Sequence, residues 1–448
     1  MKIRLIRHWE QVRGSYWFVP GLMSLGAVAL AAGLGYVDMM AQAHAFPVLE
    51  SLYLAGPSGA RAVLSTIAGS AITVAGVVFS ITVVVLSMAS AQFGPRLLRN
   101  FMEHGGTQLT LGTFIGTFIY CLLVLSTVRS DGGHVYVPQV SVGAGIVLGV
   151  ISFLLLIYFV HHVSIFIQAP RIIDDVVQNL ERALLAGFPE RADGPPEVTP
   201  DEEEAEAKRL SRAALEPGCV PVHAPRSGYI QAVDLDRLLA IAEEKDQFIR
   251  LRRRPGQFAI AGRALAEVAP GAALDDETAG RIAGTFVIGP ERTPTQDPEF
   301  AVNQLVELAL RALSPGINDP FSAINCVERL GSSLALLAGR TLPSRFLRDG
   351  NDRVRVVTEP YTYRGIVDAA FNQIRQAARC NAAVTFRLLE IIHTLGRGDL
   401  PRPYREALRE QCRAIHELGR DCFHSERDRQ DFEDRYGSAM GVLDTPGD

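Results

Sequence analysis

The sequence lacks the short motifs that mark common enzymes. HExxH, GxSxG, P-loop and dinucleotide-binding patterns are missing, and no Ser-His-Asp set can be assembled from the order of the residues. The sequence therefore favours a protein without catalytic activity and indicates no cofactor. No pattern in it points to nucleic acid as a partner.

Cysteine is scarce and scattered. The six cysteines include no CxxC pair, and Cys121 lies inside a long apolar run. We therefore expect no disulfide framework. Cys412, His416, Cys422 and His424 are close in sequence, but their spacing fits no standard zinc finger. We expect no metal site.

Charged side chains are missing from four long apolar segments. We predict that these segments span a bilayer, which needs about 20 apolar residues. They are Tyr16–Val37, Ala62–Ser90, Leu109–Val128 and Val140–Val163. Without an intramembrane carboxylate or basic group, a proton-coupled transporter or a voltage sensor is disfavoured. No removable signal peptide is recognisable, so we expect the first segment to remain as a helix.

The second apolar segment carries hydroxyl groups at heptad spacing. The candidate pore-lining residues are Thr66, Ser70, Thr73, Ser80 and Ser87. Such a face suits close packing of helices, since small residues let backbones approach. It also suits the wall of a water-filled pore, where hydroxyls replace water around a passing ion. Both interpretations require a partner helix, and we expect a homo-oligomer.

Basic residues near the ends of the segments predict the orientation in the membrane. They are Lys2, Arg4, Arg7 and Arg13 before the first segment, Arg96 and Arg99 after the second, and Arg171 after the fourth. The opposite loops carry only Arg61 and Arg129 as basic residues, together with the acidic Asp38, Glu50 and Asp131. The positive-inside rule therefore predicts that both termini are cytoplasmic.

The second segment is followed by Gly94-Pro95 and a short basic stretch, residues 96–102. Pro95 is expected to kink or end the helix. With Arg96 and Arg99, the stretch is suited to lie among lipid headgroups as an elbow that transmits force to the long helix. The alternative is a solvated connection with two basic residues.

Over the whole chain, the sequence predicts five regions. They are a transmembrane domain at 1–168, a helical extension of the fourth span with an acidic linker at 169–216, a small β-rich domain at 217–290, a helical domain at 291–440 and a flexible tail at 441–448. The fold class is therefore an α-helical membrane protein with four spans and a cytoplasmic α+β region.

Two stretches of the soluble part are candidate sites. The densest basic cluster, Arg250, Arg252, Arg253 and Arg254, is a candidate contact for anionic lipid or phosphate, or else a solvated strand face. In residues 291–330, two Asp-Pro pairs predict helix starts with Asp caps. The ligand or interface candidates expected to converge around the turn between those helices are Arg292, Asp297, Arg311, Ser314, Asn318 and Asp319. Capping alone also explains both aspartates.

Three stretches resemble one protein family. SMASAQFGPRLLRNFM at 87–102, LGTFIGTFIYCLLVL at 111–125 and RALSPGINDPFSAI at 311–324 are similar to bacterial membrane proteins known only as domain of unknown function 2254. The resemblance extends over nearly the whole chain and implies a multi-pass protein of the bacterial inner membrane with a cytoplasmic C-terminal portion. It brings no activity or catalytic residue.

Two functions follow from these patterns. The first is a homo-oligomeric channel for ions, in which the second span lines the pathway and the soluble region gates or senses. The alternative is a membrane-anchored sensor or scaffold, in which the spans only pack and the soluble region binds a ligand or partner.

Overall fold

The computed structural model describes residues 17–44, 56–93, 105–131, 134–166, 169–190, 205–206, 209–210, 218–270 and 274–444. The chain divides between residues 168 and 169 into two compact units. The expectations for Lys2 to Arg13, the kink at Pro95, the basic stretch with Arg96 and Arg99, and most of the acidic linker lie outside the described residues.

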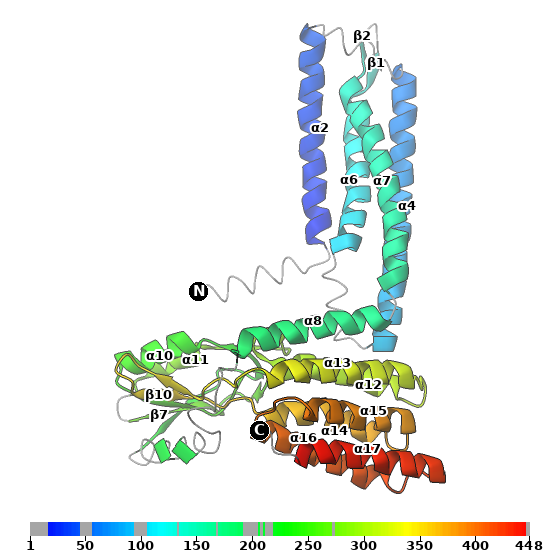
Figure 1. Cartoon of the computed structure of the whole chain (residues 1–448). Coiled ribbons are helices and arrows are strands. Elements are labelled where there is room, and N and C mark those ends of the chain that lie inside the picture. The colour runs from blue at the N-terminus through cyan, green and yellow to red at the C-terminus, as the bar shows by residue number, and fades with distance from the viewer. Residues whose placement is uncertain are drawn as a thin grey trace. The chain divides into compact units, whose positions relative to one another are not determined.

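The first unit contains four long apolar helices (Figure 1). They are α2 (Phe18–His44), α4 (Pro57–Phe93), α6 (Gly105–Thr127) and α7 (Gln139–Phe166). Each is long and apolar enough to cross a membrane, which confirms the four predicted spans. Strands β1 (Arg129–Asp131) and β2 (His134–Tyr136) form a hairpin between α6 and α7.

Helix α6 is the central helix of this unit and contacts the other three. Small residues make the approach possible, because a Cβ atom at Gly112 would meet Met23 and the backbone of Pro20. A hydrogen bond of 3.0 Å joins the hydroxyls of Thr117 and Ser152 between α6 and α7. The interior of the unit is therefore packed through close contacts and satisfied hydroxyls.

One carboxylate contradicts the expectation that no charged residue lies inside a span. Asp38 was assigned to a loop, but α2 continues to His44 and Asp38 is buried within its apolar stretch. A helix continues past an isolated polar residue when that residue finds partners, and Asp38 has them at the start of α7.

The second unit contains two sheets. A five-stranded sheet has the order β3-β7-β5-β10-β9, and a three-stranded sheet has the order β6-β4-β8. The strands are β3 (Val220–His223), β4 (Gly228–Val233), β5 (Phe248–Leu251), β6 (Phe258–Ala259), β7 (Ala264–Ala269), β8 (Phe286–Gly289), β9 (Phe346–Arg348) and β10 (Val354–Val357). Strand β10 pairs in parallel with β5, so residues 346–357 join the β-rich part although the sequence assigned them to the helical region.

Two short helices cover the sheets. Helix α10 (Leu235–Glu244) begins after the cap Asp234, and α11 is Asp276–Ala283. Ile230, Leu238 and Ile249 belong to their shared apolar core. A 3₁₀ turn, η2 (Pro294–Gln296), leads from β8 into the helical part.

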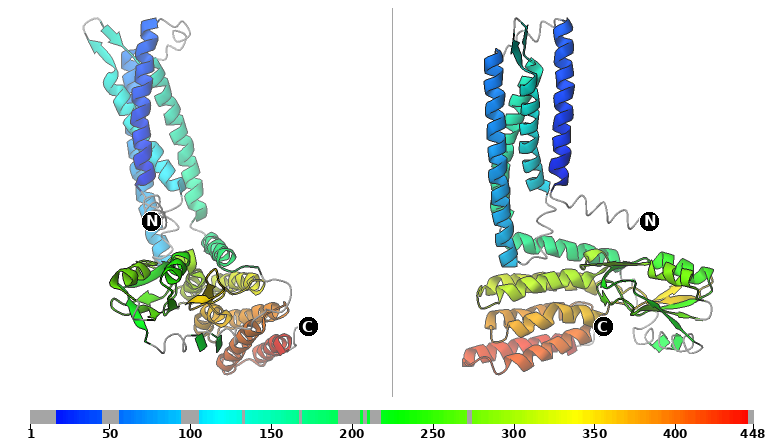
Figure 2. Two further views of the ribbon diagram at one scale, coloured as in Figure 1. Left: turned by 90° about the vertical axis from the view of Figure 1, so that its left-hand side faces the viewer. Right: turned by 180° about the vertical axis from the view of Figure 1, so that it is seen from behind.

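The helical part is a stack of antiparallel helix pairs (Figures 1 and 2). The pairs are α12 (Pro298–Ala312) with α13 (Pro320–Ala338), α14 (Tyr363–Ala377) with α15 (Ala382–Gly396), and α16 (Arg402–Gly419) with α17 (Glu426–Asp444). Residues 441–444 therefore lie in α17, although a tail was expected from 441.

Helix α8 (Ala169–Gly187) covers the first of these pairs. It buries Ile173, Val176 and Leu180 and contacts both α12 and α13. The sequence predicted an extension of the fourth span, but α8 is a separate helix of the second unit. Pro170 near its start favours a new helix, because proline suits the first turn and disrupts a helix interior.

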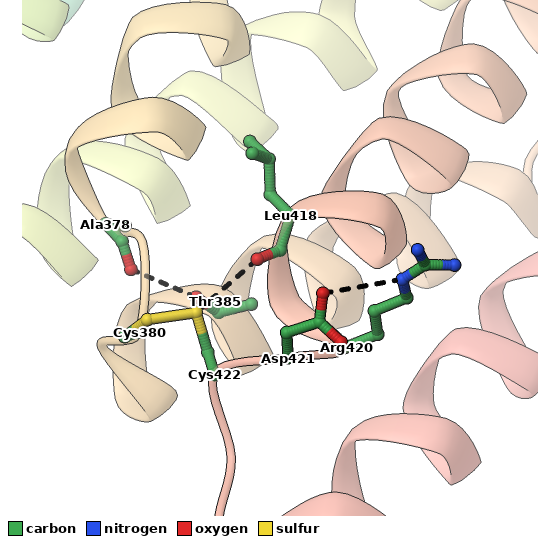
Figure 3. Close-up of a disulfide and its surroundings, with 7 residues drawn as sticks. All are labelled: Ala378, Cys380, Thr385, Leu418, Arg420, Asp421 and Cys422. Carbon is green, nitrogen blue, oxygen red and sulfur yellow. Dashed lines mark hydrogen bonds and ion pairs between the residues drawn. A yellow bond between two sulfur atoms is a disulfide. The ribbon is translucent and has the colours of Figure 1, made fainter.

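A disulfide joins Cys380 to Cys422, although the sequence indicated no disulfide framework. Cys380 lies between α14 and α15, and Cys422 lies between α16 and α17, so the bond ties two helix pairs of the stack together (Figure 3). The two cysteines are 42 residues apart. The spacing of cysteines in the sequence does not reveal this disulfide, because the pairing depends on which loops the fold brings together.

Candidate functional site

The hydroxyl face of α4 is the outer face of the first unit. Thr66, Ser70, Thr73, Ser80 and Ser87 are all exposed in the single chain. The opposite side of α4 is packed on the other helices and buries Leu64, Ala71, Ala75 and Val78. At 100° per residue these two sets lie on opposite sides of the helix. The structure therefore brings the five candidates together on one face of α4, which also carries Val77 and Val84 between the hydroxyls.

Two of these hydroxyls already donate within α4. Thr66 donates to the carbonyl of Ala62 at 2.7 Å, and Thr73 donates to the carbonyl of Gly69 at 2.8 Å. A hydroxyl has one donor and two acceptor lone pairs. Because the donor is used by the backbone, the oxygen is left as an acceptor on the exposed face, as the wall of a cation or water pathway requires.

Asp38 fixes the start of α7. Its carboxylate accepts hydrogen bonds of 2.9 Å from the backbone N–H groups of Val140 and Ser141, and one of 2.6 Å from the Ser141 hydroxyl. The Tyr120 hydroxyl donates to the Ser141 carbonyl at 2.9 Å. A carboxylate is favourable at a helix N-terminus. Asp38 thus links α2, α6 and α7.

In the second unit, Arg292 and Asp297 lie at the N-terminal end of α12. Asp297 is buried and caps α12 by accepting from the backbone N–H of Phe300, and Arg292 pairs with it at 2.7 Å. Burial raises the pKa of the Asp297 carboxyl, although Arg292 opposes the shift. The predicted Asp cap is confirmed.

A second ion pair lies in the same region. Arg254 pairs with Glu299 at 2.9 Å and lies over the ring of Tyr361, 4.2 Å from its centroid. The Tyr361 hydroxyl donates to the carbonyl of Gln296 at 2.8 Å. These groups come from the β-rich part, η2, α12 and the start of α14, so the arrangement holds the sheets against the helical stack. Arg254, Glu299 and Tyr361 satisfy one another, as a structural joint requires.

The other candidates of this stretch lie at the far end of α12. A helix of 15 residues is about 22 Å long, so Arg311, Ser314, Asn318 and Asp319 are separated from Arg292 and Asp297. The six residues do not converge on one point. Asp319 caps α13, as predicted, and hydrogen bonds from Ser322 lower the pKa of its carboxyl.

The basic cluster is paired at two of its four residues. Arg252 binds Glu267 at 2.6 Å, and Arg254 binds Glu299. Arg250 is half-buried, and burial together with Arg252 lowers the pKa of its guanidinium. Arg253 is exposed. The four residues are therefore distributed between ion pairs and solvent.

The cysteines and histidines of residues 412–424, near the C-terminus, are likewise in different environments. Cys422 is in the disulfide, Cys412 is buried, and His416 contacts Glu433 at 3.0 Å.

Comparison with known proteins identifies relatives of the chain. Residues 13–394 match the family described as predicted membrane protein (DUF2254). Uncharacterised proteins of Mycobacterium bovis and Mycobacterium tuberculosis are 31% identical over 446 residues, which are 98% of this chain and 82% of each relative. No solved structure matches the chain.

Proposed function

The chain belongs to the DUF2254 family of predicted membrane proteins, and we propose that it forms a homo-oligomeric channel lined by α4. Copies of α4 turn the stripe of Thr66, Ser70, Thr73, Ser80 and Ser87 toward a shared axis. The soluble units around that axis gate or sense. The observation that carries the proposal is the exposure of this stripe on the outer face of the unit.

Lipid is a poor partner for such a stripe. Hydrocarbon offers no hydrogen bonds, whereas small and hydroxylic residues favour contact with another helix or with water. Apolar side chains flank the stripe, including Ile81 and Val83, and these suit the contacts between neighbouring copies.

The length of the stripe favours a pathway. Thr66 and Ser87 are 21 positions apart, which corresponds to about 32 Å along a helix and matches a hydrocarbon core of about 30 Å. A packing contact needs only a few small residues at a crossing point. The hydroxyl oxygens recur at intervals of at most seven residues, or about 10 Å, from one end of the stripe to the other.

The same proposal places the protein in the bacterial inner membrane with both termini cytoplasmic. The basic residues that flank the spans support this orientation. Only residues 167 and 168 separate α7 from α8, so a movement of the helical stack is transmitted to the fourth span through a short connection.

Ion flux from liposomes tests the proposal. We expect purified protein to release ions, and Thr73→Leu or Ser80→Leu to abolish the flux without changing the oligomer mass, because leucine replaces an acceptor oxygen by a bulky apolar group. Phe79→Leu is the matched control, since Phe79 is exposed on α4 but lies outside the stripe. Flux that persists unchanged in both stripe variants would contradict a pathway along α4.

A further inference from the structure

The turn between α12 and α13 presents two apolar side chains to solvent. Phe321 is 83% exposed, the highest value among the large hydrophobic residues in the described part of the chain, and Ile317 is 49% exposed. Pro315 and Gly316 beside them are also exposed. Neither capping nor packing requires an apolar residue at position 317 or 321, so this pair needs another explanation.

Several backbone hydrogen bonds hold the turn in its conformation. Ile317 and Asn318 donate their N–H groups to the carbonyl of Ser314 at 3.0 and 2.9 Å, and Asp319 donates to the carbonyl of Ala312 at 2.8 Å. The Asp319 side chain then caps α13. Ile317 and Phe321 are therefore held on a fixed support, which lowers the entropy lost when they are buried by a partner.

The turn lies beside the start of α8, at one end of the second unit. Asp174 of α8 pairs with Arg329 of α13 at 2.6 Å, and Glu190 after α8 forms a bridge with Arg340 after α13. The two helices therefore run in parallel. Phe321 precedes Arg329 by about 12 Å along α13, and the start of α8 precedes Asp174 by about 8 Å in the same direction.

Chain connectivity limits how far this end can be from the bilayer. Ala169 follows Phe166, the last residue of α7, by three positions, so their Cα atoms are at most about 11 Å apart. Packed helices have axes about 8–10 Å apart, so Phe321 lies close to the start of α8. The exposed apolar pair is thus within reach of the membrane surface.

We propose that Ile317 and Phe321 insert into the boundary between lipid headgroups and acyl chains and so anchor the soluble unit to the bilayer. The charged groups nearest the turn have partners within the protein: Asp319 caps α13, and Arg311 lies 3.9 Å from Glu307. The contact is therefore apolar and does not depend on anionic lipid. This anchor is independent of the channel and rests on the membrane spans alone.

Tryptophan fluorescence of the full chain in liposomes tests the anchor. The two native tryptophans, Trp9 and Trp17, are replaced by Phe, and Phe321→Trp supplies a single probe. We expect a blue-shifted emission that phospholipid with brominated acyl chains lowers about twofold, since an indole ring favours the interface. Zwitterionic and anionic vesicles are expected to give the same result.

Phe258→Trp in the same background is the matched control. Phe258 is 48% exposed on β6, in the β-rich part, and its probe is expected to emit as an indole in water and to escape quenching. Emission from position 321 that stays water-like would overturn the proposal. A blue-shifted but unquenched emission, with a smaller oligomer in Phe321→Asp, would instead assign the pair to a contact between copies.

Discussion

Gly256 shows how closely the β-rich part approaches the start of α12. Its φ is +87°, and a Cβ atom there would collide with the carboxylate of Asp297. Gly262 has a similar φ of +75°, but its Cβ would meet open space. The two positions share the same backbone requirement and differ only in the neighbouring carboxylate.

We therefore expect Gly256→Ala to destabilise the second unit more than Gly262→Ala. The left-handed conformation costs alanine about 1–2 kcal/mol at either position. At position 256 the displaced Asp297 also loses its pairing with Arg292, which adds roughly 3 kcal/mol. Thermal or denaturant unfolding of the purified full-length protein measures both variants. Equal losses would contradict the close contact between Gly256 and Asp297.

Single residues also show where sequence reasoning succeeds and where it fails. Asp297 and Asp319 were predicted as caps because the signal is local: an Asp before a proline at a helix start. Asp38 was assigned to a loop, because its partners Val140 and Ser141 lie about a hundred residues away in the sequence. Nothing near Asp38 reveals that α7 begins beside it. An Asp that caps the helix directly following it can be predicted from sequence. Asp38 of α2, which caps the distant helix α7, cannot.

At the scale of elements, the disulfide between two interhelix loops makes a measurable contribution. Closing a 42-residue loop is expected to stabilise the fold by about 4 kcal/mol through the entropy of the unfolded chain. We expect a reductant to lower the melting temperature of the purified protein, and Cys380→Ser to lower it equally and to abolish the response to reductant.

Cys219→Ser is the control for the disulfide prediction. Cys219 is exposed and unpaired, so its removal is expected to leave both the melting temperature and the response to reductant unchanged. A melting temperature of the unmodified protein that does not respond to reductant would contradict a stabilising bond between Cys380 and Cys422.

Helices and strands of this chain differ in how well the sequence predicts them. The four spans were predictable because composition and length suffice. Strands β9 and β10 were not, because a parallel pair such as β5 with β10 joins segments about a hundred residues apart. Ser80 could be placed on a stripe from spacing alone, but whether that stripe faces inward or outward depends on which side of α4 packs on α6.

At the scale of the whole molecule, two observations disagree about orientation. The basic residues flanking the spans favour a cytoplasmic soluble unit, whereas a disulfide is typical of the oxidising side of the membrane. Cysteine chemistry can decide between them. Cys326 and Cys412 are buried, and burial raises the pKa of both thiols to about 12, while Cys219 is exposed. A thiol reagent therefore reacts first at Cys219.

We expect a membrane-impermeant maleimide to leave Cys219 unmodified in cells whose inner membrane is intact and to modify it once that membrane is opened. Cys219→Ser identifies the signal, since it is expected to remove the modification in opened cells. A cytoplasmic unit implies in addition that Cys380 and Cys422 are thiols in growing cells and pair on exposure to air. Modification of Cys219 in intact cells would reverse the orientation. It would place the disulfide in its expected compartment and the turn with Phe321 at the outer surface of the same membrane.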